Sequence, residues 1–339
     1  MEKESKKLPY YEISGGYKEI GEFIGTTFRK QIQESVRKRK LEIDRYDTYL
    51  EKSNACLSIT REYFPNLIDE SEAIANSAEV PLIDYFFINN REAYDPFEES
   101  DRQDMVNQDH CTVVVGFNNG FPIIGHNEDW SIDVIDELYI LKVKMKERSF
   151  IGLNYNVGVP GLSASMNSFG LVQCINDLHQ ANGIGVPKNY IARAILEAKS
   201  LTEAEEIIES VPRASGFNHV LVQGENVRNI EIAGDRVGIE NSFGKPYIHT
   251  NHYLTPELKE YEDFHTKSSE RRYERARELV KEKMGFNDVR GILSDRQDSE
   301  YPICREKETI GSAIFLPNES KAFFCYGLPS ENSFVEYSL

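Results

Sequence analysis

Apolar residues near the start of the chain recur at the spacing of an amphipathic helix. Four of them, Ile20, Phe23, Ile24 and Phe28, stand at positions i, i+3, i+4 and i+8, which share one face of a helix. This pattern predicts helices over residues 17–93. Pro65 and Pro81 mark two further helix starts, because proline is tolerated in the first helical turn. The run 29–45 is dense in Lys, Arg and Glu, which predicts a solvated helix face.

The pattern changes at residue 111 to short apolar runs bounded by turn residues, which is typical of β-strands. The predicted strands span residues 112–117, 121–126, 137–146, 149–155, 161–166, 171–176, 218–223, 227–233, 245–249, 312–317 and 321–326. Helical periodicity returns at residues 190–199, 202–209 and 269–283. Runs of strands separated by a block of helices predict an α+β sandwich, in which helices cover sheets.

Length and charge narrow the class of protein. The 339 residues suffice for one large domain or two ordinary ones, and 40% of them are hydrophobic. The formal charge of −17 argues against nucleic acid and anionic membranes as partners, because both attract cationic surfaces. No apolar run approaches the ~18 residues of a membrane span, and the charged N-terminus does not have the pattern of a signal peptide.

Cysteine usage favours a reducing compartment. The five cysteines are scattered along the chain and form no CxxC pair, since they stand at positions 56, 111, 174, 304 and 325. This spacing argues against a structural zinc site and against a disulfide framework. We therefore expect a cytoplasmic protein that needs no cofactor and no metal.

Cys111 is the first candidate for chemistry, because it opens a predicted hairpin whose far end carries the polar cluster 126–130. A thiol reacts as the thiolate, and with an ordinary pKa of about 8.5 it needs a base. The neighbouring His110 would point to the other face of a strand. If the bond between His110 and Cys111 were cut, the new α-amine, with a pKa of about 7.7–8.0, could take the thiol proton. The alternative is that Cys111 is a small buried core residue.

Two other residues fit around such a nucleophile. Asp129, at the end of the second hairpin strand, could orient the amine or bind substrate, or it could cap a turn. Asn251 lies in the polar segment His249-Thr250-Asn251-His252, which follows another apolar run. Its amide could donate to an oxyanion, or it could be an ordinary turn residue.

The same segments leave a metal site as an alternative. The possible ligands are His126, Glu128, Asp129, His249 and His252. Against a metal, a spacing of three beside a strand does not put His249 and His252 on one face, and the chain has no HExxH motif.

Several motifs, in this order along the chain, match one family. They are Cys111-Thr112, Gly125-His126-Asn127-Glu128-Asp129-Trp130, Asn167-Ser168-Phe169-Gly170 leading to Asn176, His249-Thr250-Asn251-His252, and Tyr301-Pro302-Ile303-Cys304-Arg305. On these residues the chain resembles the acyl-coenzyme A:6-aminopenicillanic-acid acyltransferase (isopenicillin N acyltransferase) group of N-terminal-nucleophile (Ntn) hydrolases. The resemblance covers nearly the whole chain, and the shared order makes it far more specific than any single motif.

The resemblance implies a fold and a maturation step. The fold would be a four-layer αββα Ntn-hydrolase sandwich, with two antiparallel sheets between helical layers. Cleavage between His110 and Cys111 would give an N-terminal helical segment, 1–110, and a β-chain, 111–339, which together form one structural domain. The family usually has glycine at the position of His110, and glycine eases the tight backbone that cleavage requires. His110 could instead assist the proton transfers of processing.

The resemblance also implies roles for single residues. Cys111 would be the nucleophile with its own α-amine as the base, Asp129 would orient that amine, and Asn251 would donate to the oxyanion. Secondary contacts to the substrate or the site are expected from Asn176, His126, Arg305 and Thr112.

The implied activity is that of an Ntn amidohydrolase or acyltransferase, which acts on the C–N amide bond of an N-acylated small molecule through a thioester. The expected partners are the small-molecule amide or acyl donor and the chain's own cleaved N-terminal segment, with no nucleic acid and no membrane. Two alternatives are a metal-dependent amidohydrolase built on the His clusters and a catalytically inactive binding protein with the same fold.

Overall fold

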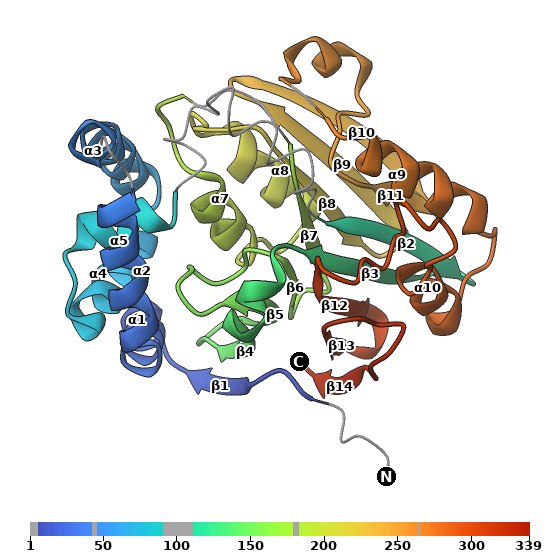
Figure 1. The fold of residues 1–339 in the computed structure, drawn as a ribbon, viewed down its shortest axis with the longest axis horizontal. Coiled ribbons are helices and arrows are strands. Elements are labelled where there is room, and N and C mark those ends of the chain that lie inside the picture. Colours follow the sequence, from blue (N-terminus) through green and yellow to red (C-terminus); the bar gives the residue numbers. More distant parts are fainter. Residues whose placement is uncertain (1–5, 43–45, 91–110, 179–182, 264) are drawn as a thin grey trace.

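The structure is a computed structural model that describes residues 6–42, 46–90, 111–178, 183–263 and 265–339. Its strands form one sheet of eight and one sheet of six (Figure 1). His110, and with it the predicted cleavage site, lies outside the described residues.

The N-terminal part is helical, as predicted. Its helices are α1 (Tyr17–Thr27), α2 (Arg29–Glu42), α3 (Tyr46–Tyr63), α4 (Pro65–Ala78) and α5 (Leu82–Ile88). Pro65 is the first residue of α4 and Pro81 immediately precedes α5, so both prolines mark helix starts. A short strand, β1 (Tyr10–Ser14), comes before these helices and is not predicted by the sequence pattern.

The eight-stranded sheet has the order β1-β4-β5-β6-β7-β8-β9-β10. Its further strands are β4 (Leu138–Lys144), β5 (Ser149–Tyr155), β6 (Ala164–Asn167), β7 (Val172–Asp177), β8 (Phe217–Gln223), β9 (Asn226–Ala233) and β10 (Arg236–Phe243). β1 runs parallel to β4, with Tyr10 opposite Ile140, whereas the other neighbours are antiparallel. The expectation of two antiparallel sheets is therefore wrong at this edge, where a strand from the N-terminal segment joins the sheet.

The six-stranded sheet is antiparallel and has the order β11-β2-β3-β12-β13-β14. Its strands are β2 (Thr112–Asn118), β3 (Phe121–Asp129), β11 (Tyr247–His249), β12 (Thr309–Leu316), β13 (Lys321–Tyr326) and β14 (Val335–Ser338). The β2–β3 hairpin turns at Asn119 and Gly120, which have φ angles of 52° and 82°. Two positive φ angles in a row are typical of the tight turns that join antiparallel strands, so the predicted hairpin is confirmed.

The remaining helices are α7 (Lys188–Ile195), α8 (Leu201–Glu209), α9 (Lys267–Leu279) and α10 (Phe286–Leu293). Short 3-10 helices lie at η2 (Ile132–Glu137), η3 (Pro256–Tyr261) and η4 (Pro317–Glu319). Among the described helices, none is long and apolar enough to cross a membrane.

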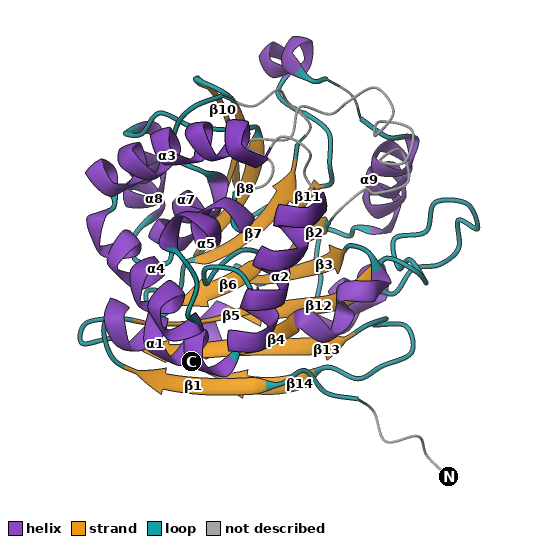
Figure 2. Cartoon of the chain, turned by 60° about the vertical axis from the view of Figure 1, so that its left-hand side comes forward, coloured by secondary structure: helices purple, strands orange, loops and turns teal. Residues whose placement is uncertain are grey.

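Four layers follow from where the apolar residues pack. One core, which includes Ile20 and Leu141, joins the helices α1–α5, α7 and α8 to the eight-stranded sheet. A second fills the space between the sheets and includes Val113 and Ile140. A third, with Val114, joins the six-stranded sheet to α9 and α10. The order is helices, sheet, sheet, helices (Figure 2), which confirms the predicted layered α+β sandwich.

Two glycines let α10 lie directly on the hairpin. A Cβ atom on Gly125 would stand 2.5 Å from Val289 Cγ1, and one on Gly116 would stand 2.7 Å from Met284 Cβ. Contacts that short do not occur, so neither strand could carry a side chain at these positions without moving the segment above it. The absent side chains therefore set the distance between this sheet and its outer helices.

Candidate active site

Cys111 stands at the start of β2, where strands from both sides bring the predicted site residues together. On one side His249 of β11 pairs with Val113, and Arg272 donates both to the backbone oxygen of Cys111 and to Oδ1 of Asn251, two residues after His249. On the other side Thr112 pairs with Asn127 of β3, which sets Glu128 beside Cys111. Alternation along β2 turns Cys111 to the same side as Val113, toward the space between the sheets.

The Cys111 thiol is buried and its pKa is raised. Only 5% of the residue is exposed. Burial raises the pKa of the thiol well above its ordinary value, and the carboxylates of Glu128 and Asp129 raise it further, while the backbone amide of Asp129 opposes them. The sulfur is therefore protonated at neutral pH, and attack on a substrate requires a base that removes this proton at the site.

Asp129 ends β3 and is fully buried. Its Oδ1 accepts a hydrogen bond of 2.6 Å from Thr309 Oγ1, whereas its Oδ2 has no hydrogen-bond partner among the described residues. Nη1 of Arg305 lies 4.0 Å from Oδ2. Burial raises the pKa of Asp129, and Arg305 and Arg272 lower it. One oxygen of this carboxylate is thus available to a donor.

Asn251 is fixed on three sides. Its Nδ2 donates to the backbone oxygen of Asp177 at 3.1 Å, and its Oδ1 accepts from Arg272 Nη2 at 2.9 Å. Its backbone N–H donates to Ser269 Oγ at 2.7 Å. An amide nitrogen carries two hydrogens, so the bond to Asp177 occupies only one of them.

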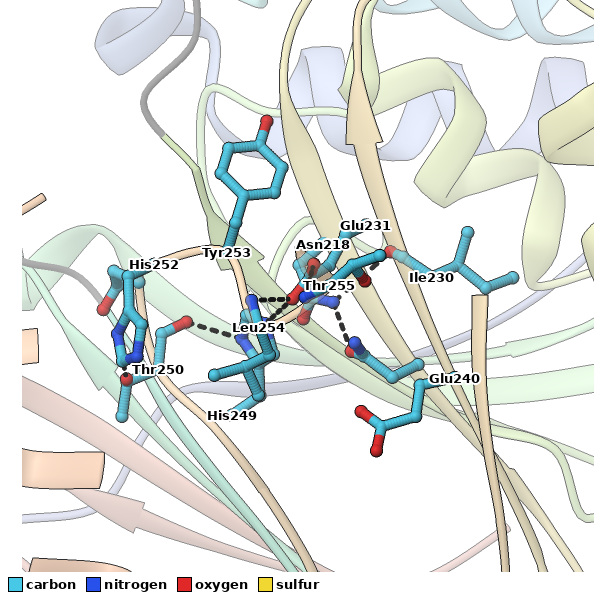
Figure 3. Close-up of polar contacts among 12 residues, drawn as sticks. Asn218, Ile230, Glu231, Glu240, His249, Thr250, His252, Tyr253, Leu254 and Thr255 are labelled. Carbon is cyan, nitrogen blue, oxygen red and sulfur yellow. Dashed lines mark hydrogen bonds and ion pairs between the residues drawn. The ribbon is translucent and has the colours of Figure 1, made fainter. Parts of the chain in front are cut away.

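The segment that holds Asn251 is tied down by one buried carboxylate (Figure 3). His249 Nε2 lies 2.8 Å from Glu231 Oε1, and the backbone N–H groups of Leu254 and Thr255 donate to the same carboxylate at 2.8 and 2.9 Å. Burial alone would raise the pKa of Glu231, but the hydrogen bonds from His249 and from the two amides lower it to about 2. His249 is therefore paired with an anion and braces the segment around Asn251.

A second polar group faces the thiol from β3. His126 Nε2 lies 2.9 Å from Glu128 Oε2, and Glu128 also accepts hydrogen bonds from Tyr155 and Ser163. Ligand atoms of Cys111, His126 and Glu128 all lie within 4.8 Å of one another. Within the described part of the chain, this is the one group of three that could hold a metal ion.

The predicted metal alternative is only partly matched by this group. Thiolate, imidazole and carboxylate are the ligands that zinc takes. Both carboxylate oxygens of Glu128 already accept hydrogen bonds, however. His249 and His252, which the alternative would use, are bonded instead to Glu231 and Ser269. The two histidine segments are thus not brought together as one ligand set.

The other predicted residues lie close to this centre. Asn176 is on β7 beside Asp177, is fully buried, and has no hydrogen-bond partner for either amide atom among the described residues. Thr112 faces α9, and its Oγ1 accepts from Arg272 Nη1 at 2.7 Å. Arg305 is also largely buried, and its backbone N–H donates to Thr309 Oγ1 at 2.8 Å.

The sequence pattern does not single out Arg272, which touches more of the site than any predicted secondary residue. It lies in α9, within the charged segment 269–283 that is predicted only to be helical, and it is fully buried. The buried positions of α9 are one stripe, at Ser268, Ser269, Arg272 and Ala276. A helical wheel of this segment places Arg272 on the stripe with Ala276, which is the signal that could have found it.

Comparisons with known proteins agree with the family resemblance that the motifs predict, and the match to the family model begins after Cys111 and Thr112. The family model described as acyl-coenzyme A:6-aminopenicillanic acid acyl-transferase matches residues 117–331, which is more than half of the chain. A curated relative, beta-alanyl-dopamine/carcinine hydrolase from Drosophila melanogaster, is 23% identical over 224 residues. That alignment covers 60% of this chain and 57% of the relative, so the chain matches little more than half of the relative's length.

Proposed function

The chain belongs to the acyl-coenzyme A:6-aminopenicillanic acid acyl-transferase family, and on this premise we propose that it is an Ntn-type amidohydrolase or acyltransferase with a cysteine nucleophile. The four layers and the position of Cys111 at the start of a central strand support an Ntn-hydrolase fold. The observation that carries the proposal is that the Asp129 carboxylate lies close enough to the Cys111 thiol to raise its pKa, while Arg272 bonds to both the Cys111 backbone and the Asn251 side chain.

Maturation comes first in the proposed mechanism. The Cys111 thiol attacks the carbonyl carbon of His110, the peptide C–N bond breaks, and a thioester forms. Water then hydrolyses this thioester, which frees the thiol and leaves Cys111 with an α-amine. Residues 1–110 stay bound as a separate segment. In support, β1 pairs with β4 and α1–α5 pack on the eight-stranded sheet, so this segment has a large interface with the rest of the protein.

In turnover, the freed α-amine takes the thiol proton, and its own pKa of about 7.7–8.0 suits that task near neutral pH. Asp129 accepts a hydrogen bond from the amine on its free Oδ2. The sulfur attacks the amide carbon of the substrate, and the second N–H of Asn251 donates to the oxyanion. The ammonium returns its proton to the leaving amine as the C–N bond breaks, which leaves an acyl thioester on Cys111.

The acyl group then passes to an acceptor. Water gives hydrolysis and an amine gives acyl transfer, so one site supports both activities. We propose small N-acylated amines as the substrate class. The relative's name supports it, since beta-alanyl-dopamine and carcinine are amides that the Drosophila protein is named for hydrolysing. All five cysteines are free and buried, which fits the reducing conditions of the cytoplasm.

Intact-mass spectrometry of the purified, active protein tests the maturation step. The expected result is two fragments that meet between His110 and Cys111. The same sample is assayed on a panel of N-acylated amines that includes beta-alanyl-dopamine and carcinine. A sample that holds only full-length chain and still turns over amides at full rate would contradict the α-amine mechanism.

The cluster of Cys111, His126 and Glu128 favours a metal-dependent amidohydrolase as the second candidate. A chelator separates the two. We expect the activity to survive exhaustive treatment with EDTA, because the proposed steps use no metal. Loss of activity on chelation, followed by recovery on addition of zinc, would establish the second candidate instead.

An inactive binding protein is the remaining alternative, and an alkylating probe addresses it. An active site should label Cys111 faster than the four other buried cysteines, Cys56, Cys174, Cys304 and Cys325. Equal and slow labelling of all five would favour the inactive protein.

A further inference from the structure

Arg272 joins the start of the nucleophile strand to the candidate oxyanion donor. Its Nη1 donates to the backbone oxygen of Cys111 at 2.9 Å and to Thr112 Oγ1 at 2.7 Å. Its Nη2 donates to Asn251 Oδ1 at 2.9 Å. One rigid, planar guanidinium therefore spans two segments that are far apart in sequence.

The two contacts of the Asn251 side chain determine which way its amide points. Oδ1 faces the N–H groups of Arg272, and Nδ2 faces the carbonyl of Asp177. If the amide turned over, its N–H₂ group would meet the N–H donors of Arg272, and its oxygen would meet a carbonyl oxygen. Both contacts would then be repulsive, and the buried polar groups would be left unsatisfied, which disfavours the turned-over amide. The observed orientation leaves the second N–H of Nδ2 free of these two partners.

The helix that carries Arg272 is itself fastened to the same segment. Thr266 caps α9 by accepting from the backbone N–H of Ser269 at 3.1 Å. The Ser269 hydroxyl accepts from the backbone N–H of Asn251 and lies 2.8 Å from His252 Nδ1. The position of the guanidinium relative to Asn251 is thus set by contacts of backbone as well as side chain.

We propose that Arg272 is a positioning residue, which holds the Asn251 amide in the one orientation that can present an N–H to the substrate carbonyl. This inference rests on the proposed function, because it assumes that Asn251 stabilises the oxyanion. It adds a residue from the outer helical layer, and it assigns that residue an effect on the rate of the chemical step and little effect on substrate binding.

A double-mutant cycle between Arg272 and Asn251 tests the proposal, with turnover measured on the best amide of the panel. Arg272→Met keeps the length of the side chain and removes all donors, so we expect kcat to fall about 100-fold with KM changed less than about threefold. Arg272→Lys should lose less, because it keeps the charge and one donor direction. Asn251→Ala should lose about 10²–10³-fold in kcat.

The kcat of the double variant decides whether Arg272 acts through Asn251. If Arg272 acts through Asn251, then Arg272→Met with Asn251→Ala loses no more than Asn251→Ala alone, to within about twofold. Losses that multiply would overturn the positioning role. An Asn251→Ala protein with full activity would overturn instead the oxyanion role in the proposed function, so the two failures are distinguishable.

Two measurements separate positioning from a general loss of structure. The rate of Cys111 alkylation should fall far less than kcat in the Arg272 variants, because alkylation needs no oxyanion donor, whereas the guanidinium bonds to the backbone oxygen of Cys111. Arg193→Lys is the matched control, since Arg193 is also fully buried but lies in α7 of the other helical layer. It should leave kcat unchanged. If Arg272→Met does not fold, Arg272→Lys carries the same cycle, and additive losses in it would overturn the proposal equally.

Discussion

Two fully buried arginines, one in each helical layer, have different surroundings. Arg193 in α7 makes a two-pronged pair with Glu70, with distances of 3.0 and 2.8 Å, and its Nη1 reaches Glu197 at 3.1 Å. Four hydrogen bonds of Arg272 in α9 end on neutral oxygens, which belong to Cys111, Thr112, Asn251 and Ser268. One guanidinium is matched by carboxylates, and the other is held by polar groups of the candidate active site.

Arg193 belongs to a structural ion pair, whereas the charge of Arg272 acts on residues of the candidate active site. The positive charge of Arg193 is balanced by the carboxylates of Glu70 and Glu197, which bond to it directly. The charge of Arg272 extends to the neighbouring carboxyl and lowers the pKa of Asp129 against the larger, opposite effect of burial. We therefore expect mutations near Arg193 to change stability and mutations near Arg272 to change catalysis.

The largest effect should come from the nucleophile. Cys111→Ala should lower kcat by at least about 10⁴-fold, because no other group can form the thioester. The midpoint of urea unfolding should shift little, since a small buried side chain is removed from a polar site. Cys174→Ala, which removes another fully buried thiol on β7, is the control and should keep its activity. Full turnover by Cys111→Ala would end the nucleophile assignment.

The comparison predicts the reverse pattern in the other helical layer. Glu70→Gln leaves Arg193 buried beside a neutral amide and should lower the free energy of unfolding by about 3–5 kcal/mol. The kcat of the folded fraction should not change. Glu205→Gln, which breaks a partly exposed pair with Arg228, is the control and should cost less than about 1 kcal/mol. Urea titrations measure both variants, and a selective loss of kcat in Glu70→Gln would contradict the distinction.

On the catalytic side, Asn251→Asp is a sharper probe than removal of the side chain. The carboxylate keeps an acceptor for Arg272 but loses the N–H donors, so we expect kcat to fall about 10²–10³-fold while Arg272 stays paired. One carboxylate oxygen would face the backbone oxygen of Asp177, so the free energy of unfolding in urea should also fall by roughly 1–3 kcal/mol, and kcat is therefore taken for the folded fraction. If Asn251→Asp retained wild-type kcat, the amide donor would have no part in catalysis.

Glu231 lies beside the active site but should behave like the Glu70 pair, because its carboxylate is fully matched by donors. Its pKa of about 2 in the folded protein lies below its ordinary value of 4.5. The resulting stability, roughly 3 kcal/mol, is present above pH 4.5 and is lost as the pH falls toward 2. Urea unfolding at pH 5, 4 and 3 measures this decline. A Glu231→Gln variant that showed the same decline would assign it to other groups.

Local patterns in the sequence predict the β2–β3 hairpin, because its turn and both strands are contiguous and largely buried. Three of the four edge strands, β1, β10 and β14, are not predicted, whereas the edge strand β11 is. β10 carries mostly exposed side chains, and β14 is short and half-buried, so neither has a strong apolar signal. β1 joins the sheet through a parallel pair with β4, a contact far along the chain that no local pattern encodes. α10 is short and contains Gly291, which weakens its helical signal.

The residues of the candidate site likewise divide into those that local sequence patterns predict and those that they do not. Cys111 lies in a motif at the start of an apolar run, whereas Asp129 and Asn251 lie in motifs that follow one, and the pairing of β2 with β3 and β11 brings these motifs to one end of the sheet. Arg272 belongs to no such motif. Its burial depends on how α9 packs against β2 and β11, so its neighbours cannot be deduced from a charged helical segment alone. Thr309, which donates a hydrogen bond to Asp129, cannot be predicted either, because it lies in β12, far from Asp129 in the sequence.

Gly125 shows that a residue within a catalytic motif can be needed for packing and not for chemistry. It belongs to the polar box that ends in Asp129, yet it lies inside a regular strand and makes room for Val289 and Leu293. A mutational scan would score this position as intolerant even though it touches no reacting atom. Anyone who redesigns the substrate preference of this protein should therefore vary the residues that face the space between the sheets, and should treat Gly125 and the helix seated on it as fixed scaffold.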